Sequence, residues 1–278
     1  MTASSVELIE TDASAAPALL APFDEQTSFD VGSGRRTLFA VRRTQGRAVV
    51  GSAVLGDDAL DLHIAPEFRA QGSGGAAAAQ LLERAGDGPL TAWSHEDHPA
   101  ARALAARFGF ERVRTLLLLR LSPLPEQPGG DRFGTFRPGA DEAEWLALNA
   151  RVFAWHPEQG AVSADDLAQR MAEPWFDADD FLVARDEEGA MTGYCWLKIE
   201  QGQSTGEIYV IGVAPEASGQ GLGRALMSAA LTRLSQRGCT AAELYVESDN
   251  TAAVRLYRGL GFSDAQVHVQ YARRAVTG

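Results

Sequence analysis

Three glycines at alternate positions, Gly219, Gly221 and Gly223, follow the apolar run Ile208–Val213 and precede a stretch with apolar residues at helical spacing. Because glycine has no Cβ, the backbone N–H groups of such a loop are open to an approaching anion. Amides at the start of a helix, supported by the helix dipole, bind phosphate and pyrophosphate groups. The spacing therefore predicts a pyrophosphate-binding loop, and a plain turn before a helix is the alternative.

The residues around this loop resemble the GCN5-related N-acetyltransferase (GNAT) family. The family's loop pattern, Q/R-x-x-G-x-G/A, runs from Ser218 to Gly223, with serine at the first position instead of glutamine or arginine. A second family segment, N-x-x-A-x-x-x-Y-x-x-x-G-F, runs from Asn250 to Phe262. The resemblance implies an acetyl-CoA-dependent acetyltransferase with an α/β fold around a mixed sheet. It assigns acetyl-CoA binding to Ile211, Gly212, Val213, Ser218, Gly219, Gln220, Gly221, Leu222, Gly223, Arg224, Asn250, Thr251, Ala252, Ala253, Val254 and Arg255.

Acetyl transfer to an amine requires a base, a polarised thioester carbonyl and a proton for the leaving thiolate. An α-ammonium has a pKa of about 7.7–8, so a modest base such as Glu207 removes its proton, often through a water. A contact to the substrate ammonium and a solvated strand-end carboxylate are the alternatives for Glu207. The resemblance directs the phenol of Tyr257 at the CoA sulfur as the general acid, and a core aromatic is the alternative. It also assigns carbonyl polarisation to the backbone amides of the central strand where it splays from its neighbour.

The chain contains an internal repeat. Leu62–Glu67 matches Ile211–Glu216 at an offset of 149 residues, and Arg69, Gly72 and Gly74 repeat the glycine loop at the same offset. A period near 150 residues indicates two domains rather than a solenoid. The repeat adds an expected second cofactor loop at Leu62, His63, Ile64, Gly72, Ser73 and Gly74.

A further match, between Arg107–Phe110 and Gly259–Phe262, has an offset of 152 residues. By these offsets, Tyr257 corresponds to Ala105, Asn250 to His98 and Glu207 to Asp58. Alanine has no proton to donate, so we expect only the C-terminal half to catalyse and the N-terminal half to support it. The expected organisation is two tandem GNAT-type domains, residues 1–122 and 135–278, joined by a Pro- and Gly-rich linker at 123–134.

Periodicity and turn signals predict the elements that position these residues. Ser163 is the expected N-cap of one helix, because its hydroxyl can accept from unpaired amides of the first turn. The expected helices are 76–84, 140–153, 164–171, 225–237 and 251–260, and the expected strands are 181–185, 192–199, 207–213, 242–247 and 267–272.

A finer resemblance is to the mycothiol synthase family of tandem acetyltransferases. Asn149–Gly160 is similar to its FAxHPEQG segment, and Trp196–Lys198 and Leu244–Asn250 match further family segments. The resemblance implies transfer from acetyl-CoA to the cysteinyl amine of cysteinyl-glucosaminyl-inositol. It assigns acceptor binding to Glu25, Glu158, Lys198, Glu207 and Tyr245. Another amine acceptor (an aminoglycoside or a protein N-terminus) and a non-catalytic acyl-CoA-sensing module are the alternatives.

Composition limits the partners. The net charge of −12 and the pI near 4.9 argue against contacts to a nucleic-acid backbone. No export signal and no run of 18 apolar residues is visible, so we expect a cytoplasmic protein outside the membrane. We also expect a monomer. The two cysteines, Cys195 and Cys239, have no metal-ligand or redox spacing and are interpreted as small buried residues. His156 is interpreted as a polar turn residue, and no metal is expected.

Overall fold

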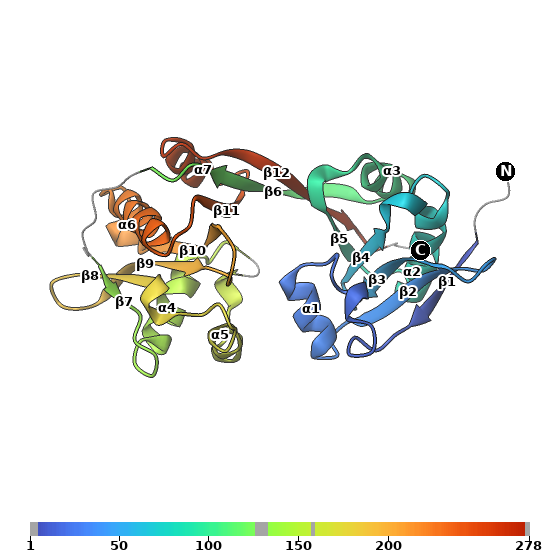
Figure 1. Cartoon of the computed structure of the whole chain (residues 1–278), viewed down its shortest axis with the longest axis horizontal. Helices are drawn as coiled ribbons and strands as arrows, with labels where there is room; N and C mark the ends of the chain where they lie inside the picture. The colour runs from blue at the N-terminus through green and yellow to red at the C-terminus, as the bar shows by residue number, and fades with distance from the viewer. Residues whose placement is uncertain (1–4, 126–132, 157–158, 276–278) are drawn as a thin grey trace. The chain divides into compact units, whose positions relative to one another are not determined.

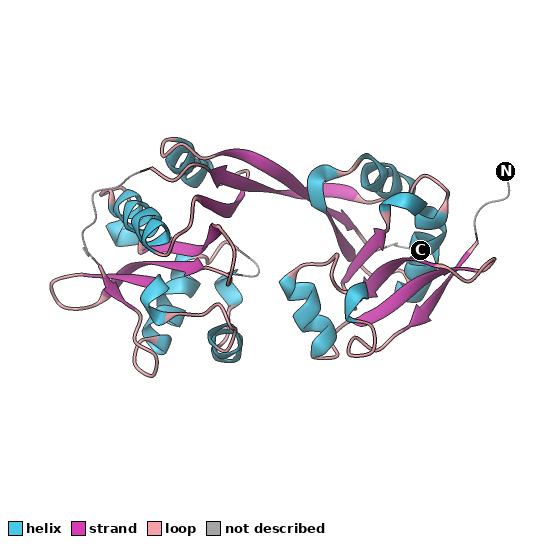
Figure 2. Cartoon of the chain, viewed as in Figure 1, coloured by secondary structure: helices cyan, strands magenta, loops and turns pink. Residues whose placement is uncertain are grey.

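The computed structural model describes residues 5–125, 133–156 and 159–275, with the side chain of Glu25 excluded. The chain forms two compact units. One is built from the residues up to Leu116 together with those from Val267 onward, and the other is Leu117–Gln266. Helices and strands of both units are labelled in Figure 1 and coloured by type in Figure 2.

The first unit contains a sheet with the strand order β1-β2-β3-β4-β5-β12. Its neighbouring strands are antiparallel except for the parallel pair β4 and β5, which α2 connects. The elements are β1 (Val6–Glu10), α1 (Glu25–Gly32), β2 (Thr37–Arg43), β3 (Val49–Leu55), β4 (Ala59–Ile64), η2 (Pro66–Phe68), α2 (Ser73–Ala85), β5 (Leu90–Ser94) and α3 (Pro99–Arg107).

The second unit has the strand order β6-β11-β10-β9-β8-β7, and β10 and β11 are its parallel pair. Its elements are β7 (Gly134–Thr135), α4 (Glu142–Val152), η4 (Gln159–Ala161), α5 (Ala164–Met171), β8 (Phe181–Arg185), β9 (Met191–Lys198), β10 (Thr205–Val213), η6 (Pro215–Ala217), α6 (Leu222–Gln236), β11 (Ala241–Glu247) and α7 (Thr251–Arg258). The same strand–helix–strand unit therefore occurs twice, which is the mixed α/β fold that the repeat predicts.

Strands β6 (Glu111–Leu121) and β12 (Ser263–Arg273) each contribute to both units. The second half of β12, at the C-terminal end of the chain, pairs with β5 of the first unit. The neighbour of β11 in the second unit is β6, which comes earlier in the chain than the rest of that unit. This strand exchange is why the compact units differ from the expected ranges 1–122 and 135–278. Of the expected linker, residues 126–132 lie outside the described residues.

The sheet of the second unit separates two hydrophobic cores. Cys195 and Leu197 of β9 pack toward α6, whereas Tyr194 and Trp196 point to the opposite face, where α4 and α5 lie (Figure 1). This alternation along one strand follows from the period of two in β-structure. We call these the α6 face and the α4/α5 face.

Most expected elements are present at nearly the expected bounds. Helix α5 begins after Ser163, whose hydroxyl accepts from the Asp166 N–H in a reciprocal capping box, as predicted. The helix after the glycine loop begins at Leu222 rather than at residue 225, because Gly221 already has the left-handed conformation of the N-cap and the first turn follows directly.

None of the helices in the described ranges has the length and apolar character needed to cross a bilayer. Over those ranges, no three His, Cys, Asp or Glu side chains gather as a metal-binding group.

Candidate active site

Strands β10 and β11 diverge at their carboxyl ends. Their parallel register consists of three pairs, the last between Glu207 and Glu243, although β10 continues to Val213 and β11 to Glu247. Beyond the last pair, the strands present backbone N–H and C=O groups to the space between them. Such exposed strand edges bind an extended ligand through main-chain hydrogen bonds. The splay expected from the sequence is therefore present.

A β-bulge interrupts β10 at this opening. The register with β9 shifts between Ile208 and Val210, so Tyr209 is the extra residue. The Tyr209 hydroxyl accepts a hydrogen bond from Arg170 Nε at 3.0 Å, and its ring centroid lies 5.1 Å from that of Trp175. These contacts fix the bulge against α5 and the α4/α5 core. Tyr209, Arg170 and Trp175 were not identified from the sequence. For Tyr209 a signal was available, because the unbroken apolar run 208–211 departs from the alternation of polar and apolar residues in a regular strand.

Glu207 and Lys198 lie opposite each other in the antiparallel pair of β10 and β9, so their side chains share one face of the sheet. That face is the α4/α5 face, because Ile208, the next residue, packs toward α6. The Lys198 ammonium lies 5.3 Å from the centroid of the Trp175 ring and 3.5 Å from Glu200 Oε1. A cation held over an aromatic ring is thus placed beside the candidate base.

Tyr257 lies on α7 and is 6% exposed. It belongs to the α6-face core, together with Cys195. The centroid of its ring lies 6.1 Å from that of Phe262. Burial raises the pKa of the Tyr257 phenol above its usual value near 10, so the hydroxyl is protonated at neutral pH. The sheet therefore carries the Glu207 carboxylate on its α4/α5 face and a protonated phenol in the core on its α6 face.

The glycine loop ahead of α6 has the backbone that an anion site requires. Gly219 and Gly221 have φ of 77° and 84°, values that side-chain-bearing residues rarely adopt. The loop of the first unit has the same trace, with φ of 57° at Ala70 and 86° at Gly72. In both units a 3-10 turn precedes the loop and the left-handed glycine is the helix N-cap. The predicted repeat of the loop is confirmed at the level of backbone conformation.

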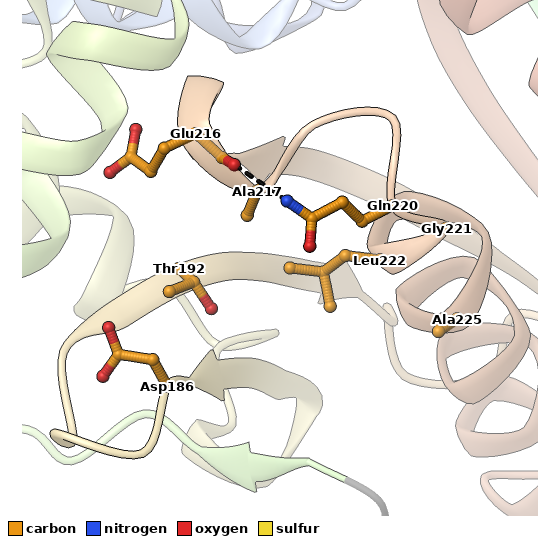
Figure 3. A pocket seen from close by; sticks show the side chains of 8 residues that line it. All are labelled: Asp186, Thr192, Glu216, Ala217, Gln220, Gly221, Leu222 and Ala225. Carbon is orange, nitrogen blue, oxygen red and sulfur yellow. Dashed lines mark hydrogen bonds between the residues drawn. The ribbon is translucent and has the colours of Figure 1, made fainter.

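A pocket of about 490 Å³ lies between the β8–β9 turn and the start of α6 (Figure 3). Gln220 Nε2 donates to the carbonyl oxygen of Glu216 at 3.0 Å across its rim. The Glu216 carboxylate is neutralised by Arg151 Nη2 at 2.6 Å, which limits its repulsion of a nearby anion. The lining residues are Asp186, Thr192, Glu216, Ala217, Gln220, Gly221, Leu222 and Ala225.

Asn250 caps α7, because its Oδ1 accepts from the Ala253 N–H at 3.2 Å. His98 does the same for α3 through Nδ1, which accepts from the Ala100 N–H at 3.1 Å. The two residues therefore have equivalent capping roles, in agreement with the 152-residue offset. Ala105, at the position of Tyr257, is buried in the first unit's core.

Strand pairing corrects one correspondence. Glu207 pairs with Glu243, and the matching pair in the first unit joins Ala59 to Thr91. Ala59, not Asp58, is thus the structural counterpart of Glu207, because the bulge adds a residue to β10 that the continuous β3–β4 register lacks. The first unit still has no acid at this position.

The remaining expected acceptor residues differ in what the structure describes. Tyr245 is 46% exposed on β11 and faces the α4/α5 side, since Leu244 and Val246 on either side of it pack toward α6. Glu25 begins α1, but its side chain lies outside the description. Glu158 lies outside the described residues.

Comparison with known proteins identifies the family and the fold. Residues 145–262 match the Acetyltransferase (GNAT) family. A GCN5-related N-acetyltransferase from Sphaerobacter thermophilus has a similar structure, with a TM-score of 0.72, 21% identity and coverage of 98% of this chain and 96% of that one. A tandem GNAT protein from the clavulanic acid biosynthesis pathway gives 0.67 at 19% identity, covering 99% and 100%. The fold and the site define a tandem GNAT acetyltransferase, a class that uses acetyl-CoA as co-substrate.

The relatives found by sequence similarity define a narrower family. The mycothiol acetyltransferase of Clavibacter sepedonicus is 44% identical over 91% of this chain and 86% of its own length. That of Salinispora tropica is 43% identical over 90% and 86%, respectively. The chain belongs to the mycothiol acetyltransferase family.

Proposed function

We propose that this enzyme transfers the acetyl group of acetyl-CoA to the cysteinyl amine of cysteinyl-glucosaminyl-inositol, giving mycothiol. The observation that carries the proposal is the divergence of β10 and β11 in a sheet that has Glu207 on one face and the buried Tyr257 in the core on the other. The family membership of the chain gives the acceptor. A small-molecule acceptor with one cationic amine and many hydroxyls also suits a face that carries carboxylates.

Glu207 is the proposed general base. It removes a proton from the cysteinyl ammonium, directly or through a water, and the neutral nitrogen attacks the thioester carbonyl carbon. The C–S bond then breaks, and Tyr257 donates its hydroxyl proton toward the departing sulfur. The phenol is protonated at neutral pH, as this role requires.

Backbone amides and the glycine loop are the proposed sites for acetyl-CoA. The amides of β10 beyond the bulge, in Ile211, Gly212 and Val213, would stabilise charge on the thioester oxygen. The first-turn amides of α6 have no intrahelical partner and suit the pyrophosphate. The left-handed Gly219 and Gly221 support this fit, because they carry no Cβ to shield those amides.

Lys198, Tyr245, Glu158 and Glu25 are the proposed acceptor contacts besides Glu207. For Lys198 and Tyr245, the support is their position on the same sheet face as Glu207. The N-terminal half is proposed to be non-catalytic, because Ala59 and Ala105 stand at the positions of Glu207 and Tyr257.

The test is to incubate purified protein with acetyl-CoA and cysteinyl-glucosaminyl-inositol and to identify products by mass spectrometry. Thiol reagents are unsuitable, because acceptor and product both carry a thiol. The expected result is one acetyl group on the cysteinyl nitrogen, also when the acceptor sulfur is blocked by methylation. Glucosaminyl-inositol without the cysteine is the control and should remain unmodified.

The alternatives are separate arms of this experiment. Acetylation of an aminoglycoside or of a peptide N-terminus at a higher kcat/KM would assign a different acceptor. Binding of acetyl-CoA without turnover of any amine would indicate a sensing module and overturn the proposal.

A further inference from the structure

The carboxyl end of β11 and the segment after α4 carry three residues to which no role has been assigned, Trp155, His156 and Glu247. Glu247 shares the α4/α5 face with Tyr245, because residues two apart in a strand point the same way. His156 Nε2 lies 3.8 Å from Glu247 Oε1, and Trp155 lies next to His156, with ring centroids 5.4 Å apart. One exposed aromatic, Trp155, thus lies beside the imidazole, and another, Tyr245, lies on the same strand face as the carboxylate.

The tautomer of a neutral His156 follows from one hydrogen bond. His156 Nδ1 accepts from the backbone N–H of Gln159 at 3.0 Å, so the ring proton of the neutral imidazole is on Nε2. That nitrogen faces Glu247, whose side chain is 9% exposed. Glu247 is thus a largely buried carboxylate near the Nε2–H group of His156, and carboxylate oxygens accept hydrogen bonds from more than one donor.

A buried network holds this segment in place. Asn149 Oδ1 accepts from the Tyr194 hydroxyl at 2.7 Å and from Gln159 Nε2 at 3.1 Å, and Asn149 Nδ2 donates to the Gln159 carbonyl at 2.6 Å. Gly160 is needed at its position, since a Cβ there would collide with the Phe153 carbonyl. Satisfied buried networks fix one arrangement of the chain, so the surface is formed before a ligand arrives.

Trp155 is 56% exposed and Tyr245 46% exposed, and among the described residues these are the exposed aromatic side chains. Single exposed apolar residues are common and carry no information. Here Tyr245 shares a sheet face with Glu247 and Glu207, and Trp155 lies against the imidazole that faces the Glu247 carboxylate. Aromatic rings beside hydrogen-bond acceptors match a ligand that has both apolar C–H faces and hydroxyl groups, which is the chemistry of a polyhydroxylated ring.

We propose that Trp155, His156 and Glu247 form a subsite for the hydroxylated ring end of the acceptor. A ring face packs on the Trp155 indole, ring hydroxyls donate to Glu247, and His156 keeps that carboxylate oriented. The spacing fits: Glu247 is four residues beyond Glu243, the register partner of Glu207, or about 13 Å at the usual rise per residue. This is comparable with the reach from an aminoacyl nitrogen to the far ring of two linked six-membered rings. The inference rests on the proposed function and adds the residues that select the acceptor.

The test compares two acceptors, cysteinyl-glucosaminyl-inositol and cysteinamide, which has the same amine and thiol but no rings. For Trp155→Ala, we expect KM for the full acceptor to rise roughly 5- to 50-fold, as expected for a lost aromatic contact. The ratio of kcat/KM between the two acceptors should fall by the same factor, and Trp155→Phe should restore most of it. Glu247→Gln should also lower the ratio. Val113→Ala, which truncates another exposed apolar side chain (51%), is the control and should leave the ratio unchanged.

Each outcome decides the proposal. Equal losses with both acceptors would mean that Trp155 acts on the amine end or on stability, and the subsite would be wrong. A wild-type enzyme that prefers the full acceptor no more than cysteinamide would refute the subsite but leave acetyl transfer intact. If the wild type acetylates neither acceptor, the proposed function fails, and the subsite fails with it.

Discussion

Glu207 and Lys198 face each other across β10 and β9, and one further pair, Ile208 and Leu197, separates them from the bulge at Tyr209. The Lys198 ammonium is held over the rings of Trp175 and Tyr209, at 5.3 and 6.0 Å from their centroids. The register pair therefore places a fixed positive charge on the same sheet face as Glu207. The candidate base and its cationic neighbour therefore lie close to the bulge in β10, where β10 and β11 diverge.

Glu207→Gln is expected to lower kcat by about 10²–10⁴, the usual effect of a lost general base. The amide keeps the shape of the side chain but cannot accept the proton from the ammonium. Single-turnover acetyl transfer, measured at saturating acetyl-CoA, reports this loss directly.

The matched control is Glu243→Gln, which changes the register partner of Glu207 on β11. Its kcat should stay within a few-fold of wild type. Similar losses in both variants would point to local charge rather than to proton removal by Glu207.

Tyr257→Phe is expected to lower kcat by a similar factor, about 10²–10⁴, while the Kd for acetyl-CoA changes little. Only the hydroxyl is removed, so the packing against Phe262 is preserved. Isothermal titration gives the Kd, and product formation gives kcat. The control is Tyr271→Phe, which removes the hydroxyl of a buried tyrosine in the first unit and should leave kcat at the wild-type value.

The pH profile tests the same residue independently. Because burial raises the pKa of Tyr257 above 10, ionisation of this phenol should cause no loss of kcat between pH 8 and about 10. A wild-type decline in that range that is absent from Tyr257→Phe would contradict the assignment.

Asp141→Asn is expected to destabilise the second unit by about 1–3 kcal/mol at neutral pH, the range for unpairing a buried polar group. Asp141 is 1% exposed and accepts from Arg137 Nη2 at 2.7 Å and Arg185 Nη2 at 2.9 Å. The hydrogen bond from Arg137 is the main cause that holds the pKa of Asp141 below its usual range; burial opposes it, and the Arg185 charge adds to it.

The sign of the pH dependence follows from this shift. Since the folded pKa is below the unfolded value near 3.9, the stabilisation is complete above that value and is lost as pH falls through the folded pKa. Urea unfolding of the wild type and of Asp141→Asn should show a difference in free energy of unfolding at pH 7, and this difference should disappear below pH 4. Asp264→Asn breaks an exposed pair with Arg258 and should cost less than about 1 kcal/mol.

Local signals in the sequence were enough to predict the repeated fold. The cap at Ser163, the strand Phe181–Arg185 and the left-handed glycines of the loop each follow from short-range chemistry. The contribution of β6 and β12 to both units was not predictable in this way. Either unit can complete its sheet with any strand that has a suitable apolar pattern, so local sequence does not say which strand each unit uses. The bulge was missed for a related reason: one extra residue changes the register but not the apolar composition of β10.

The candidate site was predicted less completely. Glu207, Lys198 and Tyr245 do share one sheet face, which strand alternation allows one to anticipate. Arg170, Trp175 and His156 come from segments outside the sheet, and their approach to it depends on tertiary packing. A 149-residue count also gave Asp58 where the strand pairing gives Ala59.

The two loops of the repeat allow a comparison within one molecule. Gly221 and Gly72 are the left-handed N-caps of α6 and α2, with φ of 84° and 86°. An alanine at either position adds a Cβ to a conformation that costs it about 1–2 kcal/mol. Each substitution should therefore disturb its own loop by a similar amount.

Gly221→Ala is expected to raise KM for acetyl-CoA at least about tenfold, since a hydrogen bond to a charged group is worth about 1.5–3 kcal/mol and about 1.4 kcal/mol is a tenfold change. Gly72→Ala, the matched control, should leave kcat/KM within about threefold of wild type if only the C-terminal half turns over. Steady-state kinetics with acetyl-CoA varied, together with thermal unfolding of both variants, separates loop damage from global destabilisation. A tenfold loss from Gly72→Ala at unchanged stability would mean that the N-terminal loop takes part in turnover, because the two substitutions differ only in the half that they disturb.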